Sequence, residues 1–161
     1  MLRRNASGKF VVTPGDCRVV VTKDFCEYYK KLILFEGIES PRDFQTPKHG
    51  AHITIVSAKI HGFRNTSKVS AFSGVTIPFS YSVNIKKGGK QFTTYYVDVD
   101  CPFANVVKKM LGVVDNQGFL GLHICIMNNK SKIKNENSNI RDIVDNACGE
   151  STDPNLGSGK K

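Results

Sequence analysis

The stretch GAHITI at residues 50–55 returns as GLHICI at residues 121–126, so a glycine, a histidine and two isoleucines keep their places in both copies. Both copies are short and rich in β-branched residues, which is typical of strands. Alternate side chains of a strand share a face. Each histidine therefore points to the same side as the residue two positions later, and the isoleucines point to the other side.

The repeat extends on both sides of this stretch. Residues 25–33 (FCEYYKKLI) align with residues 103–111 (FANVVKKML) at a constant offset of 78, with the phenylalanine and the Lys-Lys pair coinciding. At the same offset, two valines of residues 17–22 (CRVVVT) fall on two valines of residues 95–100 (YYVDVD). A repeat of this kind indicates one supersecondary unit used twice. Each half is predicted to be a strand, a helix and a histidine strand.

The helix of each half is predicted from its apolar spacing. Apolar residues at 103, 106, 107, 110 and 111 follow the i, i+3, i+4, i+7 pattern of an amphipathic helix, with Asp100 and Pro102 as start signals and Gly112 as a stop. In the first half, a helix that begins at Thr22 or Asp24 carries apolar residues towards residue 37. The isoleucine faces are the expected seats for these helices, which leaves the histidine faces uncovered.

The predicted fold class is α+β, with a single domain over residues 1–161. Its pseudo-symmetric halves, at about 9–60 and 75–127, form a bilobal, antiparallel-rich sheet with a central groove and helices on the outer faces. Lysines between residues 86 and 90 are expected at the tip of a β-hairpin. Residues 128–161 are expected to form a partly mobile C-terminal segment that acts as a lid and contains a short helix over 139–147.

Composition and charge narrow the class of protein. The longest apolar runs are far shorter than the roughly 18 residues that span a bilayer, so no membrane segment or signal peptide is expected. Five cysteines without a CxxC pair predict neither a disulfide framework nor a zinc site, and favour the cytoplasm. The net charge of +9 favours a phosphate-bearing partner. The oligomeric state is left open.

The paired histidines are the candidate functional residues. A single histidine in a strand is most often a packed or surface residue, but His52 and His123 recur in the same setting of Gly and Ile. Across a groove, two imidazoles can act as acid and base near neutral pH. Two histidines without a third repeated ligand make a poor metal site. His49 and His61 have no counterpart in the other half and are expected to be surface residues.

These motifs resemble those of the 2H phosphoesterase superfamily, which carries two H-x-[ST]-x motifs on a pseudo-symmetric sheet. Residues 52–55 (HITI) match the motif, whereas residues 123–126 (HICI) have Cys125 where Ser or Thr is usual. The resemblance covers roughly residues 17–127. Residues 48–55 (KHGAHITI) and 21–32 (VTKDFCEYYKKL) are most similar to the phage anti-CBASS nucleases, which cleave cyclic oligonucleotide signals of bacterial defence.

The resemblance implies a phosphodiesterase without metal or cofactor, located in the host cytoplasm if a phage encodes it. His52 and His123 would exchange protons, Thr54 would donate to a phosphate oxygen, and Cys125 would donate only weakly. The alternatives are a nucleotide-binding sponge without catalysis, and a phosphodiesterase acting on RNA ends or 2′-5′ oligoadenylates, for which short RNA is the substrate.

Four further residues are candidate substrate contacts, each with a plainer alternative. Tyr96 would stack on a base, or pack at the sheet edge. Arg18, its counterpart in the first half, would pair with phosphate, or lie on the surface. Lys48 would steer anions, or be solvated. Glu150 would belong to the C-terminal lid.

Overall fold

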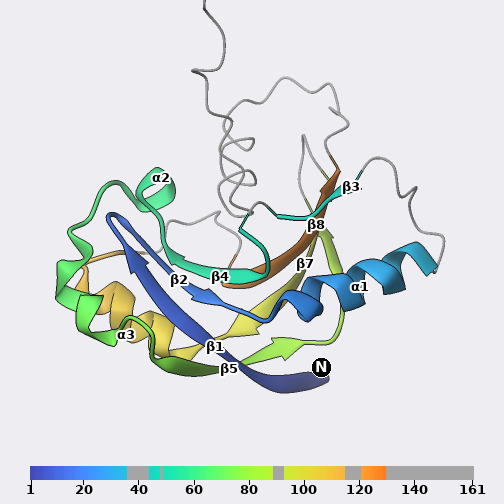
Figure 1. Ribbon diagram of the computed structural model, residues 1–161, viewed down its shortest axis with the longest axis horizontal. Helices are drawn as coiled ribbons and strands as arrows, with labels where there is room; N and C mark the ends of the chain where they lie inside the picture. The colour runs from blue at the N-terminus through green and yellow to red at the C-terminus, as the bar shows by residue number, and fades with distance from the viewer. Residues whose placement is uncertain (36–43, 48, 89–92, 115–120, 130–161) are drawn as a thin grey trace, which may run out of the picture.

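The computed structural model describes residues 1–35, 44–47, 49–88, 93–114 and 121–129 (Figure 1). Over these residues the chain forms twelve elements in the order β1 (Arg3–Thr13), β2 (Asp16–Val20), α1 (Lys23–Phe35), β3 (Phe44–Gln45), β4 (His52–Val56), α2 (Ala58–His61), the 3₁₀ helix η1 (Thr66–Phe72), β5 (Thr76–Ser82), β6 (Lys86–Gly88), β7 (Thr93–Asp100), α3 (Pro102–Met110) and β8 (His123–Asn129).

The strands form one antiparallel sheet that closes on itself. Hydrogen bonding orders them β3-β8-β4-β2-β1-β5-β7-β6, and β7 also pairs with β8. The additional pairing closes β8, β4, β2, β1, β5 and β7 into a six-stranded barrel, from which β3 and β6 extend. The α+β class and the antiparallel sheet are confirmed. The sequence did not predict the closure, because alternation identifies strands and says little about their partners.

The predicted repeat is present as β2-α1-β4 and β7-α3-β8. Two of the sequence signals mark the limits of α3: Pro102 occupies its first turn, and Gly112 follows its C-cap with a φ of +65°. The N-cap is Cys101, which makes no side-chain capping hydrogen bond, and not the expected Asp100. Proline suits the first helical turn because its missing N–H has no intrahelical partner there. Glycine suits the position after the helix because it adopts positive φ without steric cost.

The two halves are interlocked by crossed packing. Helix α1 packs chiefly against β8, and α3 packs against β4, so each helix lies against the histidine strand of the other half. One buried hydrogen bond ties the first pair together, in which Sγ of Cys26 donates to the carbonyl oxygen of Cys125 over 3.3 Å. In Figure 1, α1 and α3 lie on opposite sides of the barrel. Neither histidine strand therefore depends on its own half alone.

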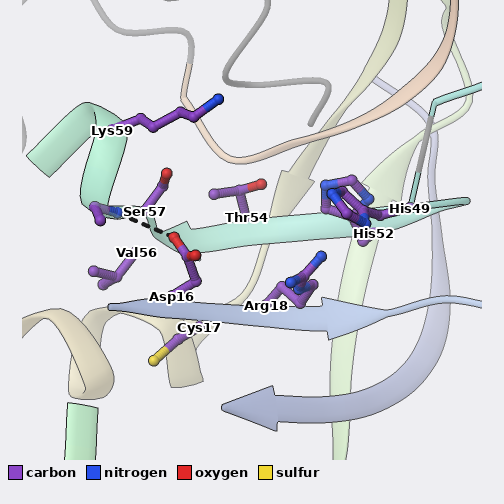
Figure 2. A pocket seen from close by; sticks show the side chains of 10 residues that line it. Asp16, Cys17, Arg18, His49, His52, Thr54, Val56, Ser57 and Lys59 are labelled. Carbon is purple, nitrogen blue, oxygen red and sulfur yellow. Dashed lines mark hydrogen bonds between the residues drawn. The ribbon is translucent and has the colours of Figure 1, made fainter. Parts of the chain in front are cut away.

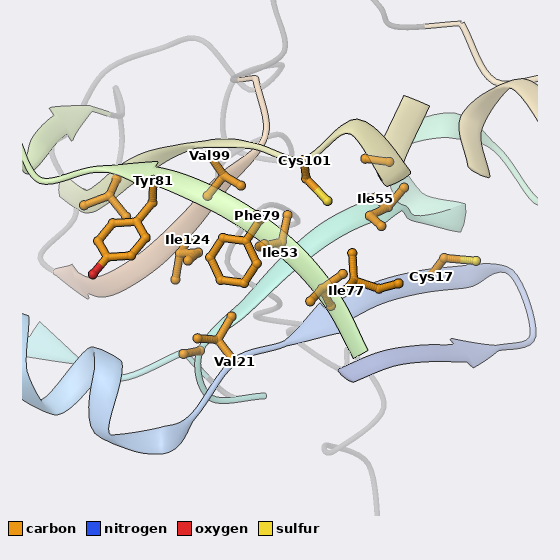
Figure 3. Close-up of a cluster of buried hydrophobic side chains, with 14 of the residues drawn as sticks. Cys17, Val21, Ile53, Ile55, Ile77, Phe79, Tyr81, Val99, Cys101 and Ile124 are labelled. Atoms are coloured by element: carbon orange, nitrogen blue, oxygen red, sulfur yellow. The ribbon is translucent and has the colours of Figure 1, made fainter. Parts of the chain in front are cut away.

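The isoleucines of both repeated stretches lie in the core. The side chains of Ile53, Ile55, Ile124 and Ile126 are fully buried, and they join one hydrophobic cluster with residues of α1 and α3. Figure 3 shows Ile53 and Ile124 beside Phe79 of β5. Each buried side chain of this size contributes roughly 1.5–3 kcal/mol. The predicted apolar face of the histidine strands is confirmed.

Two of the lysines expected at the tip of a β-hairpin lie elsewhere in the structure. Lys86 and Lys87 belong to β6, where they pair with Tyr96 and Tyr95 of β7, so they lie in a strand and not in a turn. Lys90 is outside the described residues. The two runs that flank the basic segment are adjacent as predicted, since β5 pairs with β7.

The predicted terminal helix over 139–147 and the lid over 128–161 fall on residues outside the described ranges, apart from the last two residues of β8. Within the described residues, no helix is both long enough and apolar enough to cross a membrane.

Candidate active site

The register of β4 and β8 brings both histidines to one face of the sheet. The two strands pair with Ile53 opposite Ile124. Because the pairing is antiparallel, this register sets Thr54 opposite His123 and leaves His52 diagonal to His123. Diagonal neighbours in a sheet are roughly 7–8 Å apart, within reach of long side chains and of a shared ligand.

The flanking strands add one charged side chain on each side of this pair. Arg18 of β2 is opposite Thr54, and Asp98 of β7 is opposite His123. A row of four side chains (Arg18, Thr54, His123, Asp98) therefore crosses β2, β4, β8 and β7 on the histidine face. The row has a cation at one end and a carboxylate at the other.

Each histidine makes the same hydrogen bond to the glycine two residues before it. Nδ1 of His52 lies 2.9 Å from the carbonyl oxygen of Gly50, and Nδ1 of His123 lies 2.8 Å from the carbonyl oxygen of Gly121. A carbonyl oxygen can only accept, so Nδ1 carries the proton in both rings. A neutral ring then has its lone pair on Nε2, the atom that can take a proton from a ligand. The shared Gly-x-His phrase therefore fixes the orientation and tautomer of both imidazoles.

The charges around the two histidines differ. Burial lowers the pKa of His52, and the positive charges of Arg18, His49 and His123 lower it further, against the opposing hydrogen bond to a backbone carbonyl. Burial also lowers the pKa of His123, but there the backbone hydrogen bond and the carboxylate of Asp98 oppose the shift. Burial therefore favours the neutral form of both rings, and Asp98 opposes this effect at His123 only.

A cavity of about 400 Å³ lies over β2 and β4 (Figure 2). It is lined by Arg18 of β2, by His52 and Thr54 of β4, and by Ser57 and Lys59 at the beginning of α2. This volume is within the range of small-molecule sites, roughly 300–1,000 Å³. The structure therefore brings together Arg18, His52 and Thr54, three of the residues that the sequence singled out. His123 does not line this cavity. The side chains of His52 and His123 are each only 4% exposed, which corrects the expectation that the histidine faces are uncovered.

Two residues of the cavity were missed by the sequence interpretation. His49 is exposed, as expected of a surface residue, but it also lines the cavity, with its ring centroid 6.0 Å from that of His52. Lys59 lines the other end of the cavity. His49 aligns with a leucine in the second half, so the repeat gave no signal for it. Lys59 aligns with Lys130 when the two histidine stretches are superposed, and this match could have singled it out.

Tyr96 and Asp98 support the second histidine from β7. Tyr96 is buried, and its ring lies 5.5 Å from that of His123 at an interplanar angle of 67°. Asp98 forms a salt bridge with Lys86 of β6. The predicted position of Tyr96 on the histidine face is confirmed, whereas its stacking on a base stays a prediction.

Cys125 is buried on the second histidine strand. The residue is 2% exposed, and Sγ lies 3.4 Å from Oδ1 of Asn128. Cys17, Cys26 and Cys101 are free thiols. The second motif lacks the hydroxyl that Thr54 provides in the first, and the role of Cys125 towards a phosphate stays a prediction.

Lys48 and Glu150, the two remaining sequence candidates, lie outside the described residues. Among the residues that are described, no group of three or more His, Cys, Asp or Glu side chains is arranged to hold a metal ion.

No protein-family model, curated protein or solved structure matches this chain. The function is accordingly argued from the two histidine strands, their flanking charges and the cavity.

Proposed function

We propose that this protein is a metal-independent phosphodiesterase of the 2H phosphoesterase type, which cleaves cyclic di- or trinucleotides. The observation that carries the proposal is the duplicated histidine geometry. Two imidazoles share one face of paired strands, and each donates from Nδ1 to the glycine carbonyl two residues before it. We take the two Nε2 atoms as the proton-exchanging groups, that of His52 beside the cavity and that of His123 buried on the neighbouring strand. The excess of positive charge, +9 overall, supports an anionic substrate.

The reaction needs one proton acceptor and one proton donor. A neutral imidazole takes the proton of the attacking hydroxyl as its oxygen forms a bond to phosphorus. The bond from phosphorus to the leaving oxygen breaks, and a protonated imidazole supplies the proton that this oxygen needs. General acid and base steps of this kind each contribute about 10²–10⁴-fold in rate.

The surrounding charges support a division of roles, with His52 as the base and His123 as the acid. Arg18 and His49 beside His52 disfavour its protonated form, so the ring is ready to accept a proton. Burial lowers the pKa of His123 as well, but the carboxylate of Asp98 opposes that shift, which His52 lacks, so His123 is the better candidate for the acid.

Thr54 is proposed to stabilise the charge that develops on the phosphate. Its side chain lines the cavity beside His52 and is opposite His123 in the sheet. A hydroxyl at this place can donate to a non-bridging oxygen, and loss of one such donor typically costs about 10²–10³-fold in rate. Arg18, opposite Thr54 on the other side, is proposed to pair with the same phosphate.

A second candidate function is a sponge that binds cyclic nucleotides without cleaving them. The observation that favours it is Cys125, which is buried beside Asn128 and carries a weakly donating sulfur where the superfamily motif has a hydroxyl. The site then retains the cavity and its cations but has a single hydroxyl donor in its two motifs.

The decisive experiment is incubation with cyclic di- and trinucleotides in EDTA, followed by chromatography of the products. Cleavage in EDTA supports the phosphodiesterase, and retention of intact ligand by the protein supports the sponge. If cyclic ligands are neither bound nor cleaved while RNA ends or 2′-5′ oligoadenylates are trimmed, the proposed substrate class is wrong. Activity that EDTA abolishes and a divalent metal restores contradicts the metal-independent mechanism.

Conservative variants test the individual roles. In His52→Asn and His123→Asn, the amide keeps a donor near the glycine carbonyl but removes Nε2, so we expect a rate loss of about a hundredfold or more for each. Thr54→Val removes the hydroxyl and Thr54→Ser retains it, so only the valine variant should lose most of its activity. If Thr54→Val cleaves as fast as Thr54→Ser, the hydroxyl has no part in the reaction.

A further inference from the structure

The cavity extends well beyond the reacting histidines. It continues from His52 along β4 to Ser57 and Lys59 at the beginning of α2. The five steps from residue 52 to residue 57 cover roughly 16 Å at about 3.3 Å per residue. A cavity of about 400 Å³ and this length has room for far more than one phosphate group. It therefore offers space for a second part of a ligand over the end of β4.

The side chains along the floor of the cavity alternate in chemistry. Thr54 is half-buried on β4, Val56 beyond it is fully buried, and the exposed Lys59 follows after the strand end, so a hydroxyl and a cation lie on either side of a buried apolar residue. In Figure 2, Lys59 extends from α2 towards the side of the strand from which Thr54 projects. This order fits a phosphate, a nucleoside and a second phosphate.

The one carboxylate at this end of the cavity is occupied by the backbone. Oδ1 of Asp16 accepts the N–H of Ala58 over 3.0 Å, which holds the carboxylate against the beginning of α2. Lys59 is exposed, and the hydroxyl-bearing Ser57 lies between it and the strand. An anionic group that enters from solvent thus meets a lysine and a hydroxyl, with the Asp16 carboxylate held against the beginning of α2.

We propose that Lys59 and Ser57 form a second phosphate-binding subsite, and that the substrate is a nucleotide with at least two phosphate groups joined through a nucleoside. The inference rests on the proposed function, because it takes the first phosphate to lie at Thr54 and the two histidines. The second phosphate is either another phosphodiester of a cyclic oligonucleotide or the terminal phosphate of a linear one.

Three ligands separate these cases. Cyclic di-AMP has two phosphodiesters, the linear dinucleotide ApA has one, and pApA has one phosphodiester and a terminal phosphate. For each ligand, kcat/KM is measured in EDTA, and Kd is measured by calorimetry in a His123→Asn background that leaves the ligand intact. The proteins compared are the parent, Lys59→Ala and a control, Lys68→Ala, which removes an exposed lysine of η1 that does not line the cavity.

We expect Lys59→Ala to raise the Kd and lower the kcat/KM of cyclic di-AMP by about tenfold more than those of ApA. A factor of about ten is the lower end of what a hydrogen bond to a charged group contributes. Lys68→Ala should keep the ligand ratio of the parent. An equal effect of Lys59→Ala on cyclic di-AMP and ApA overturns the subsite, even when cleavage in EDTA supports the proposed function. If pApA behaves like cyclic di-AMP, the subsite accepts a terminal phosphate; if it behaves like ApA, the subsite requires the second phosphodiester.

The two proposals fail in different ways. If no ligand is cleaved but Lys59→Ala still raises the Kd of cyclic di-AMP selectively, the phosphodiesterase is wrong and the subsite stands. If none of the three ligands binds, both are wrong.

Discussion

The two glycines of the repeated phrase should respond differently to the same substitution. Gly50 has a φ of +67°, in the left-handed region, whereas Gly121 is not among the glycines with positive φ. An added Cβ meets nothing within 4 Å at either position, so neither Gly50→Ala nor Gly121→Ala creates a clash. The comparison therefore isolates the backbone conformation. We expect Gly50→Ala to be clearly less stable than Gly121→Ala.

The expected difference follows from two terms. A left-handed conformation costs a non-glycine residue about 1–2 kcal/mol. Replacement of glycine by alanine also restricts the unfolded chain, which stabilises a compatible site by about 0.4–1 kcal/mol. The second term is common to both variants and cancels, so their free energies of unfolding should differ by about 1–2 kcal/mol. For a chain of 161 residues this corresponds to a separation of about 2–8 °C in Tm.

The assay is thermal and urea unfolding of the parent and both variants, together with Gly74→Ala. Gly74 has a φ of +88°, an open Cβ position and no part in the site, so its variant should be destabilised like Gly50→Ala. Gly50→Ala should additionally lose activity, because relief of the strain moves the carbonyl that accepts from His52. Equal stability of Gly50→Ala and Gly121→Ala would refute the left-handed requirement at Gly50.

Three other outcomes are expected. Asp98→Asn removes the carboxylate that favours a proton on His123, so the alkaline limb of the pH–rate profile should move to lower pH; an unmoved limb contradicts the acid role of His123. Burial lowers the pKa of both histidines from 6.5, so as the pH falls the unfolded chain binds protons at a higher pH than the folded chain does. The free energy of unfolding should therefore be full above pH 6.5 and should decrease as the pH falls through the folded-state pKa. Between pH 7.5 and pH 5, the Tm of His123→Asn should fall less than the Tm of the parent. Ile124→Asp places an unpaired carboxylate in the core, at a cost of several kcal/mol against a typical total stability of about 5–15 kcal/mol. The control Ile124→Val should cost only about 0.5–1.5 kcal/mol. A soluble Ile124→Asp protein with the parent's Tm would contradict the assignment of strand faces.

Local pattern was sufficient for the repeated units and insufficient for β1. The helix α3 was predictable because its apolar spacing, Pro102 and Gly112 all agree. The strand β1 (RRNASGKFVVT) alternates poorly at its start and contains Gly8, a residue that weakens a strand signal. Gly8 is required there by tertiary contact, because an added Cβ would lie 2.5 Å from the carbonyl oxygen of Val20 on β2. Such a requirement is invisible until the partner strand is known.

The same division holds for the site. The repeat predicted the shared face of His52 and His123 because a two-residue period fixes side-chain direction along a strand. It could not predict the partners across the strands. The pairing of Asp98 with His123 depends on closure of the barrel through β7 and β8, and the position of Lys59 depends on how α2 follows β4. These are long-range consequences of packing and leave no periodic signal.

The crossed packing gives a physical reason for the repetition of the Gly-x-His-Ile-x-Ile sequence. The isoleucines of both copies are buried in one core with residues of α1 and α3, and each helix packs against the histidine strand of the other half. A slip of one residue would turn the isoleucines out of this core and the histidine into it. The isoleucines thus hold the register that keeps His52 and His123 together on the other face of the sheet. The glycine before each histidine supplies the carbonyl that fixes Nδ1. Each half therefore provides one imidazole and the helix that seats the strand of the other, and a paired site follows only when both copies are present.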